Sequence, residues 1–206
     1  MLSPVLREIL EEAREFGFLG PGPVERQYEH ARDLAGIVGP FVGSFLDLGS
    51  GGGLPGLVLA DEWPEAQGTL LEAQRRRCQF LTAAVRKLGL EARVEVVCGR
   101  AEELARTPRL RSEFDLVVAR SFAAPAATAE CAVGFLRPGG ELVVSEPPDA
   151  ESSASRWDAD GMTILGFGPT SYLRQGESGA IRAELISEPA DRWPRRDGVP
   201  TKRPLW

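Results

Sequence analysis

A glycine-rich segment follows a short apolar run in the first third of the chain. The run Ser44–Leu48 contains Asp47 and leads directly into Gly49-Ser50-Gly51-Gly52-Gly53, and helix-compatible residues begin at Leu54. Glycines let the backbone approach a ligand closely at the carboxyl end of a strand, where an open α/β sheet binds its cofactor. Asp47, Gly49, Gly51 and Leu54 are therefore candidate cofactor-binding residues. The loop alone is a weak signal, because NAD enzymes, flavoproteins and plain tight turns share it.

Two further polar positions follow at intervals that suit an adenosine cofactor. Thr69–Leu71 ends in Glu72, about 20 residues after the loop, where a carboxylate can accept both ribose hydroxyls. Gly99-Arg100-Ala101-Glu102 follows the next apolar run and can present backbone amides and a side chain to an adenine edge, as expected for S-adenosylmethionine (SAM). The alternatives are a surface carboxylate at Glu72 and a helix-start carboxylate at Glu102. On the loop and Glu72 alone, NAD stays possible.

The fourth apolar run ends in residues that could line a reaction centre. Asp115–Ala119 is followed by Arg120, Ser121 and Phe122. In a sheet of this type the end of the fourth strand faces the transferred methyl group, so these three residues are candidate catalytic residues. For Arg120 the alternative is an ion pair with a neighbouring carboxylate.

Strand and helix signals alternate from Ser44 onward, which indicates parallel crossover units. Strands are expected at Ser44–Leu48, Thr69–Leu71, Arg93–Val97, Asp115–Ala119 and Glu141–Val144, and weaker ones at Met162–Phe167 and Ala180–Ser187. Helices are expected at Leu54–Glu62, Gln74–Leu88, Ala101–Arg106 and Pro125–Leu136. The predicted fold is α/β and Rossmann-like, of the class I SAM-dependent methyltransferase type, with a seven-stranded, mostly parallel sheet that a closing antiparallel hairpin completes.

Two helical segments precede the sheet, an amphipathic one within the first sixteen residues and a second from Val24 to about Val38. The chain is expected to be one methyltransferase domain, residues 1–206, with a helical cap at 1–40, a Rossmann-like core at 44–188 and a basic tail at 189–206. Charges interrupt the N-terminus before any apolar stretch reaches the length of a signal peptide or membrane span, so we expect a cytoplasmic protein.

No metal site is expected. Cys78, Cys98 and Cys131 lack the paired spacing of a zinc or disulfide framework and are interpreted as reduced, mostly buried thiols.

The tail is the one region with a clear excess of positive charge. Five Arg and Lys residues stand against two Asp between Pro189 and Trp206, so the tail carries +3 and the remainder of the chain −9, for a total of −6. A net negative charge argues against a protein that grips nucleic acid through global electrostatics. The tail is interpreted either as a solvated, proline-rich extension or as a phosphate-contacting surface.

With these residues in place, the sequence resembles the RsmG (GidB) guanine-N7 methyltransferases of small-subunit (16S) ribosomal RNA. The resemblance rests on Phe45–Gly56, with Leu54-Pro55-Gly56 its most diagnostic part, on Leu71-Glu72-Ala73, Arg100-Ala101-Glu102-Glu103 and Ala119-Arg120-Ser121-Phe122-Ala123, and on the basic ending Trp193–Leu205. It implies a SAM cofactor, contacts to it at Gly49, Leu54, Ala101, Glu102 and Arg120, and ribosomal RNA or the small ribosomal subunit as the partner. Ala73 joins the candidate cofactor residues beside Glu72. His30 is either the counterpart of a family histidine or a residue of the helical cap.

Two departures from the family pattern bear on the methyl acceptor. Ser145-Glu146-Pro147-Pro148 stands where the family usually has Lys-Gly, and Gly20-Pro21-Gly22-Pro23-Val24 replaces the usual Asn-Leu-Thr segment. A carboxylate in place of a lysine should weaken phosphate attraction. A small-molecule acceptor and a catalytically silent SAM-binding module therefore stand beside the RNA methyltransferase. An oxidoreductase is disfavoured, since no Tyr/Lys hydride-transfer pair is apparent.

Overall fold

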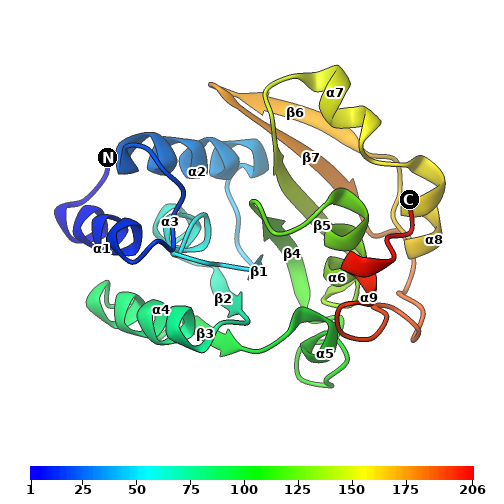
Figure 1. Ribbon diagram of the computed structural model, residues 1–206, viewed down its shortest axis with the longest axis horizontal. Helices are drawn as coiled ribbons and strands as arrows, with labels where there is room; N and C mark the ends of the chain where they lie inside the picture. Colours follow the sequence, from blue (N-terminus) through cyan, green and yellow to red (C-terminus); the bar gives the residue numbers. More distant parts are fainter.

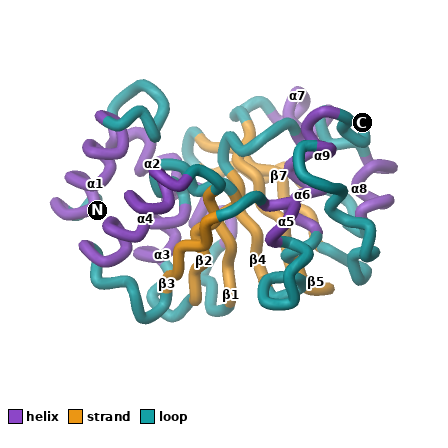
Figure 2. Tube along the Cα trace, turned by 60° about the horizontal axis from the view of Figure 1, so that its bottom comes forward, coloured by secondary structure: helices purple, strands orange, loops and turns teal.

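One twisted sheet of seven strands runs through the centre of the protein (Figures 1 and 2). The computed structural model describes residues 1–206, except for the side chain of Glu151. The strands are β1 (Ser44–Leu48), β2 (Gln67–Glu72), β3 (Val94–Cys98), β4 (Phe114–Ala119), β5 (Leu136–Glu146), β6 (Ser171–Gln175) and β7 (Ser178–Glu184). Their order across the sheet is β3-β2-β1-β4-β5-β7-β6. β1 to β5 are parallel, while β7 runs antiparallel to β5 and β6 antiparallel to β7. The predicted fold is confirmed.

Helices cover both faces of the sheet. They are α1 (Pro4–Glu15), α2 (Val24–Val38), α3 (Gly56–Glu62), α4 (Arg75–Lys87), α5 (Ala101–Leu104), α6 (Pro125–Val133), α7 (Ala150–Ser155), α8 (Ala159–Leu165) and α9 (Val199–Lys202). In Figure 1 the N-terminal helices and α4 lie at one end of the sheet, and α7 to α9 lie at the other end beside the C-terminus. The central strands are therefore flanked by the N-terminal helices at one end of the sheet and by the C-terminal helices at the other.

Alternation along the buried strands builds two hydrophobic cores. Phe45, Leu116 and Val118 face one side of the sheet and pack with α1 to α4, whereas Leu46, Leu48 and Val117 face the other side and pack with α5, α6 and α8. Successive side chains of a strand point to opposite faces, so a strand covered on both faces reads as a continuous apolar run. This is why the five central strands were recognisable in the sequence.

The helical cap forms as expected. Ser3 begins α1, its hydroxyl accepting the Leu6 amide at 3.2 Å, and Pro4 occupies the first turn, where its missing N–H is not needed. α2 covers Val24–Val38 and ends at Gly39. α2 then packs against both α3 and the β6–β7 hairpin. The cap therefore contacts the hairpin that forms one edge of the sheet.

The segment after β5 differs from the prediction in two places. Met162–Phe167 was expected to be a strand, but residues up to Leu165 belong to α8: the Asp158 carboxylate caps its start by accepting the Gly161 amide at 2.7 Å, and Gly166 ends it in the left-handed region at φ 96°. The one strand-type pairing described for this segment is an isolated bridge between Phe167 and Leu185. The first strand of the hairpin is instead Ser171–Gln175, an outer strand whose exposed polar residues gave no strand signal.

The interpretation of the cysteines is also wrong for two of them. Cys78 and Cys98 form a disulfide with a Cα–Cα distance of 5.8 Å, and Cys98 is exposed. They meet because Cys98 pairs with Glu72 on the neighbouring strand, and Cys78 lies in the first turns of the helix that follows Glu72. Cys131 is a buried thiol, and its burial raises its pKa.

The C-terminal segment, residues 189–206, packs against the protein and is not a solvated extension. Trp193 is buried. The Arg195 guanidinium and backbone amide donate to the fully buried Glu130 carboxylate at 2.6 to 2.8 Å. The Arg111 guanidinium donates to carbonyl oxygens at Pro189 and Trp193. The interpretation as a solvated extension is therefore wrong, because Glu130 on α6 and Arg111 in the loop before β4 hold this segment.

Membrane-spanning helices and metal-ion sites are features of other classes of protein. Within the described part of the chain, no helix has both the length and the apolar composition needed to cross a membrane. Among the described side chains, no three His, Cys, Asp or Glu residues gather as a group that could hold a metal ion.

Candidate functional site

The glycine loop lies where the strand order of the sheet reverses. β1 pairs with β2 on one side and β4 on the other, and such a switch point leaves a crevice at the carboxyl ends of the strands. Gly49 and Ser50 donate their amides to the Leu71 carbonyl at 2.9 Å, which ties the loop to the end of β2. Gly49 and Gly51 have φ of 76° and 55°, a region that other residues avoid. The sequence thus fixes an open loop at this edge.

Asp47 lies beneath this loop. Its carboxylate is fully buried, and its Oδ2 accepts the amide of Gly56, at the start of α3, at 3.0 Å. Burial raises the pKa of Asp47 to about 6, while the hydrogen bond from the Gly56 amide opposes the rise. Oδ1 is buried and has no hydrogen-bond partner among the described residues. Asp47 therefore holds the shape of the loop from below.

Glu72 lies at the end of β2 and is 5% exposed. Its Oε2 accepts the Gly51 amide at 2.9 Å, and its Oε1 accepts the Gln74 amide at 2.8 Å. Each carboxylate oxygen keeps a second lone pair. Glu72 thus supports the glycine loop from the side, and the neighbouring Ala73 is exposed.

The turn after β3 makes contacts that the sequence did not indicate. Ala101 and Glu102 begin α5 and are buried. The Glu102 Oε1 accepts the backbone amide of Gly198 at 3.0 Å and a guanidinium N–H of Arg100 at 3.2 Å. Arg100 also binds Asp197 at 2.8 Å. The side chain of Glu102 therefore faces the C-terminal segment.

Arg120, at the end of β4, faces the N-terminal cap. Its guanidinium donates to the Gln27 carbonyl at 3.3 Å and to the Gln27 side-chain oxygen at 3.1 Å. Burial lowers the pKa of Arg120, and the charge of Asp47 acts in the opposite direction. Gln27 in turn donates to the Gly20 carbonyl at 3.0 Å. Arg120 is thereby connected to the loop between α1 and α2.

Ser121 and Phe122 complete the end of β4. Ser121 has φ of 56°, although it is not a glycine. A Cβ atom built on Gly49 would lie 2.5 Å from Cδ2 of Phe122, so the ring packs directly against the glycine loop. The structure therefore brings the three candidate catalytic residues to one end of the sheet.

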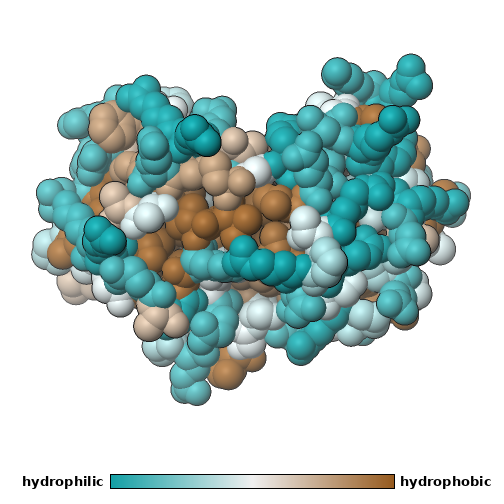
Figure 3. All heavy atoms as spheres, turned by 90° about the horizontal axis from the view of Figure 1, so that it is seen from below, coloured by the Kyte–Doolittle hydropathy of each residue, from teal (hydrophilic) through white to brown (hydrophobic). Residues whose placement is uncertain are grey.

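A cleft of about 1050 Å³ opens in front of these elements. Figure 3 shows the outline of the molecule hollowed between two lobes. Of the predicted site residues, those that line the cleft are Gly49, Gly51, Leu54, Arg120 and Ser121. Those that lie behind or beside it are Asp47, Glu72, Ala73, Ala101, Glu102 and Phe122.

The opposite wall of the cleft consists of residues that sequence reasoning did not select as site residues. The segment Phe18–Pro21 covers the glycine loop, and Gln27 and His30 project from α2. Ser145 lines the cleft from β5. The available signals were the glycine- and proline-rich break between the first two helices and the single histidine of the chain.

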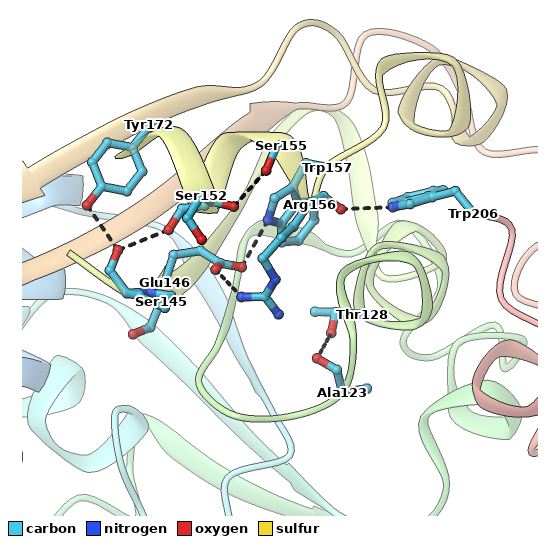
Figure 4. A network of polar contacts seen from close by, with 12 residues as sticks. Ala123, Thr128, Ser145, Glu146, Ser152, Ser155, Arg156, Trp157, Tyr172 and Trp206 are labelled. Atoms are coloured by element: carbon cyan, nitrogen blue, oxygen red, sulfur yellow. Dashed lines mark hydrogen bonds and ion pairs between the residues drawn. The ribbon is translucent and has the colours of Figure 1, made fainter. Parts of the chain in front are cut away.

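Glu146 has a different environment from the one the sequence suggested. It is 5% exposed, forms an ion pair with Arg156, and accepts the Trp157 indole N–H at 2.9 Å. Figure 4 shows its carboxylate turned toward these two residues, while the Ser145 hydroxyl points to the other side of the strand. The negative charge of Glu146 is therefore paired within the protein.

Comparison with known proteins agrees with this geometry. The family model for rRNA small subunit methyltransferase G matches residues 28–159. The Ribosomal RNA small subunit methyltransferase G of Moorella thermoacetica is 35% identical over 174 residues, covering 81% of this chain and 71% of the relative. The protein of the same name from Thermotoga neapolitana is 38% identical over 170 residues, covering 79% and 72%.

Solved structures share the fold at lower sequence identity. A putative O-methyltransferase from Klebsiella pneumoniae superposes with a TM-score of 0.61 at 19% identity, covering 90% of this chain and 91% of the other. The mitomycin 7-O-methyltransferase superposes with a TM-score of 0.66 at 18% identity, covering 85% and 58%.

Proposed function

Because this chain belongs to the rRNA small subunit methyltransferase G family, we propose that it transfers the methyl group of SAM to N7 of a guanine in small-subunit ribosomal RNA. The observation that carries the proposal is the cleft, which has the glycine loop on one wall and four arginines on its lining. The arginines are Arg26, Arg77, Arg120 and Arg174. Arg26 is paired with Glu177 and Arg77 with Glu72, so Arg120 and Arg174 are the guanidinium groups that face the cofactor loop without a carboxylate partner among the described ion pairs. Such groups suit a substrate that carries phosphates.

SAM is the cofactor, and the residues of the loop fit it. A Cβ atom on Gly51 would have no described heavy atom nearer than the Phe18 carbonyl oxygen at 3.6 Å, so this position leaves the backbone open to a ligand. When bound, SAM supplies an electrophilic methyl group on a sulfonium. Glu72 and Asp47 keep the loop in the conformation that receives it, and Glu72 retains lone pairs for ribose hydroxyls.

The acceptor requires alignment more than proton transfer. N7 of guanine carries a lone pair and no proton, so no general base is needed, and catalysis depends on holding N7 in line with the methyl group. Arg120, which lines the cleft and is fixed by Gln27, orients the substrate. Because the sulfonium charge is lost as the methyl group moves, a site that excludes water favours the reaction.

The pairing of Glu146 favours RNA over a small-molecule acceptor. The concern was a carboxylate that repels phosphate at the rim of the site. Arg156 neutralises that carboxylate, so its effect on a phosphate in the cleft is small. The exposed residues Arg192, Arg196, Lys202 and Arg203 place positive charge on the C-terminal segment, and we include them as a contact region for the ribosomal subunit.

The deciding experiment is transfer of tritium from labelled SAM to small ribosomal subunits, to naked RNA and to a metabolite extract. The proposal expects label in a single guanine of the small-subunit RNA. Label in the small-molecule fraction would overturn the acceptor, and SAM binding without transfer to any of the three would indicate a catalytically silent module.

A second experiment tests the placement of Arg120. Arg120→Ala should lower methyl transfer about a hundredfold, because misaligned reactants lose rate on this scale. Arg86→Ala is the control, since Arg86 is exposed at the end of α4. Unchanged SAM affinity and unchanged transfer in Arg120→Ala would remove this residue from the site.

A further inference from the structure

Four polar side chains form a continuous hydrogen-bonded row on the wall opposite the glycine loop. The Ser178 hydroxyl, on β7, lies 2.8 Å from Asp33 Oδ2 and 3.0 Å from His30 Nδ1. His30 Nε2 lies 2.7 Å from the Ser145 hydroxyl on β5. Asp33 and His30 both belong to α2. The row therefore joins the N-terminal cap to two strands of the C-terminal half.

The chemistry of these groups fixes the direction of each hydrogen bond. An ionised carboxylate only accepts, so the single proton of the Ser178 hydroxyl points to Asp33. The Ser178 oxygen must then accept from His30, which places the imidazole proton on Nδ1. Neutral imidazole carries one N–H, so Nε2 is an acceptor, and the Ser145 hydroxyl donates to it. The Ser145 oxygen is left with lone pairs and no free proton.

The surroundings keep the imidazole neutral. Burial lowers the pKa of His30 below the ordinary value of 6.5; the positive charges of Arg120 and Arg26 act in the same direction, and Asp33 opposes them. The charged groups that face His30 are thus Arg120 from the end of β4 and Asp33 and Arg26 from α2, whereas Glu146 on β5 is paired with Arg156. Ser178 is 2% exposed, so water does not replace it readily.

We propose that Asp33, Ser178 and His30 form a positioning relay that holds the Ser145 hydroxyl as a hydrogen-bond acceptor for an N–H group of the target base. His30 and Ser145 both line the cleft. Guanine presents N–H donors on its Watson–Crick edge, and unpaired bases are read by hydrogen bonds to that edge. This inference rests on the proposed function, since it assigns a specificity residue to the same site.

Protonation of His30 gives the relay a distinctive pH dependence. Imidazolium donates from both nitrogens, so below the His30 pKa Nε2 would donate to the Ser145 oxygen and turn the hydroxyl proton away. One of the two lone pairs of the Ser145 oxygen is then used by His30, and its hydroxyl proton points away from His30, so Ser145 becomes a poorer acceptor for the base. Binding of the base should weaken as the pH falls through the His30 pKa, and a variant without the Ser145 hydroxyl should lack this dependence.

The first experiment reads the tautomer directly and needs no enzymatic activity. His30 is the one histidine of the sequence, so nitrogen NMR of the untagged chain reports it without assignment. We expect the Nδ1–H tautomer in the wild type and a shift toward Nε2–H in Ser178→Ala, with Ser155→Ala, an exposed serine, as the control. An Nε2–H tautomer in the wild type would overturn the relay.

The second experiment measures transfer to small ribosomal subunits by the wild type and two variants. Ser145→Ala should raise KM for the subunit about tenfold, the usual weight of one hydrogen bond to substrate, and leave kcat and SAM affinity unchanged. Ser145→Thr keeps the hydroxyl and should restore KM. If the wild type transfers nothing, the proposed function fails. If the wild type is active and Ser145→Ala has an unchanged KM at every pH, the inference fails.

Discussion

The two walls of the cleft are built in different ways. On the cofactor wall, Asp47 contacts Gly56 across 9 residues of sequence and Gly51 contacts Glu72 across 21. On the acceptor wall, Arg120 contacts Gln27 across 93 residues, Ser145 contacts His30 across 115, and Ser178 contacts His30 across 148. The cofactor wall is thus a local product of two consecutive strand ends, whereas the acceptor wall exists only when the cap and the last strands meet.

The C-terminal segment repeats the pattern of the acceptor wall. Arg195 reaches Glu130 across 65 residues, and Gly198 reaches Glu102 across 96. Substitutions on the cofactor wall should therefore change mainly SAM binding, while substitutions that remove long-range contacts should lower stability or substrate binding. Four predictions test this contrast.

The largest effect is expected where a long-range contact pairs a buried charge. Arg195→Ala leaves the fully buried Glu130 carboxylate without its bidentate partner and should lower the free energy of unfolding by about 3 kcal/mol or more. Arg196→Ala, at an exposed position, should change it by less than about 0.5 kcal/mol. Urea unfolding measures both. Equal stability of the two variants would mean that the C-terminal segment is not held by this contact.

The next effect is the pH dependence that Asp47 imposes. Its folded-state pKa of about 6 lies above the ordinary 3.8, so the folded state binds the proton more tightly than the unfolded state. The resulting stability is present at low pH and is lost as the pH rises through about 6, by about 3 kcal/mol in total. Asp47→Asn cannot titrate, so wild type should lose stability relative to this variant between about pH 4 and pH 7. A constant difference over that range contradicts the prediction.

A smaller and purely local effect is expected at Gly51. Ala at this position places a methyl group in the cleft, so SAM affinity should fall about tenfold to a hundredfold, the range of local overpacking. Gly89→Ala is the matched control, because Gly89 also has positive φ but faces open space. Both variants should lose similar stability, about 1 kcal/mol, from the left-handed backbone. Calorimetric titration with SAM separates them, and equal affinities would place the cofactor elsewhere.

The smallest effect is expected for a single arginine on the acceptor side of the cleft. Arg174→Gln should weaken binding to small ribosomal subunits about threefold and reduce the salt dependence by about one counterion. SAM affinity should not change. Arg109→Gln, an exposed residue outside the cleft lining, is the control. A larger loss of subunit binding in the control than in Arg174→Gln would indicate that RNA binds outside the cleft.

Most of the fold was predictable because its signals are local. The central strands are buried on both faces and read as apolar runs, and the glycines after β1 mark the switch point. The prediction failed at Met162–Phe167, where an aspartate cap and a left-handed glycine favour a helix. It also failed at Cys78 and Cys98, because a separation of 20 residues does not reveal that a helix turn and a neighbouring strand end lie side by side.

The sequence by itself determined the class of fold, the family and the cofactor loop, since strand, glycine turn, helix and acidic strand end follow one another within about thirty residues. Only the tertiary structure decided what faces that loop. His30 meets Ser178 and Ser145 because α2 packs against β7 and reaches the end of β5. The charge of Glu146 does not repel phosphate because Arg156 pairs with it. Pattern and periodicity report which face of an element is buried, but they do not report which distant side chain it meets.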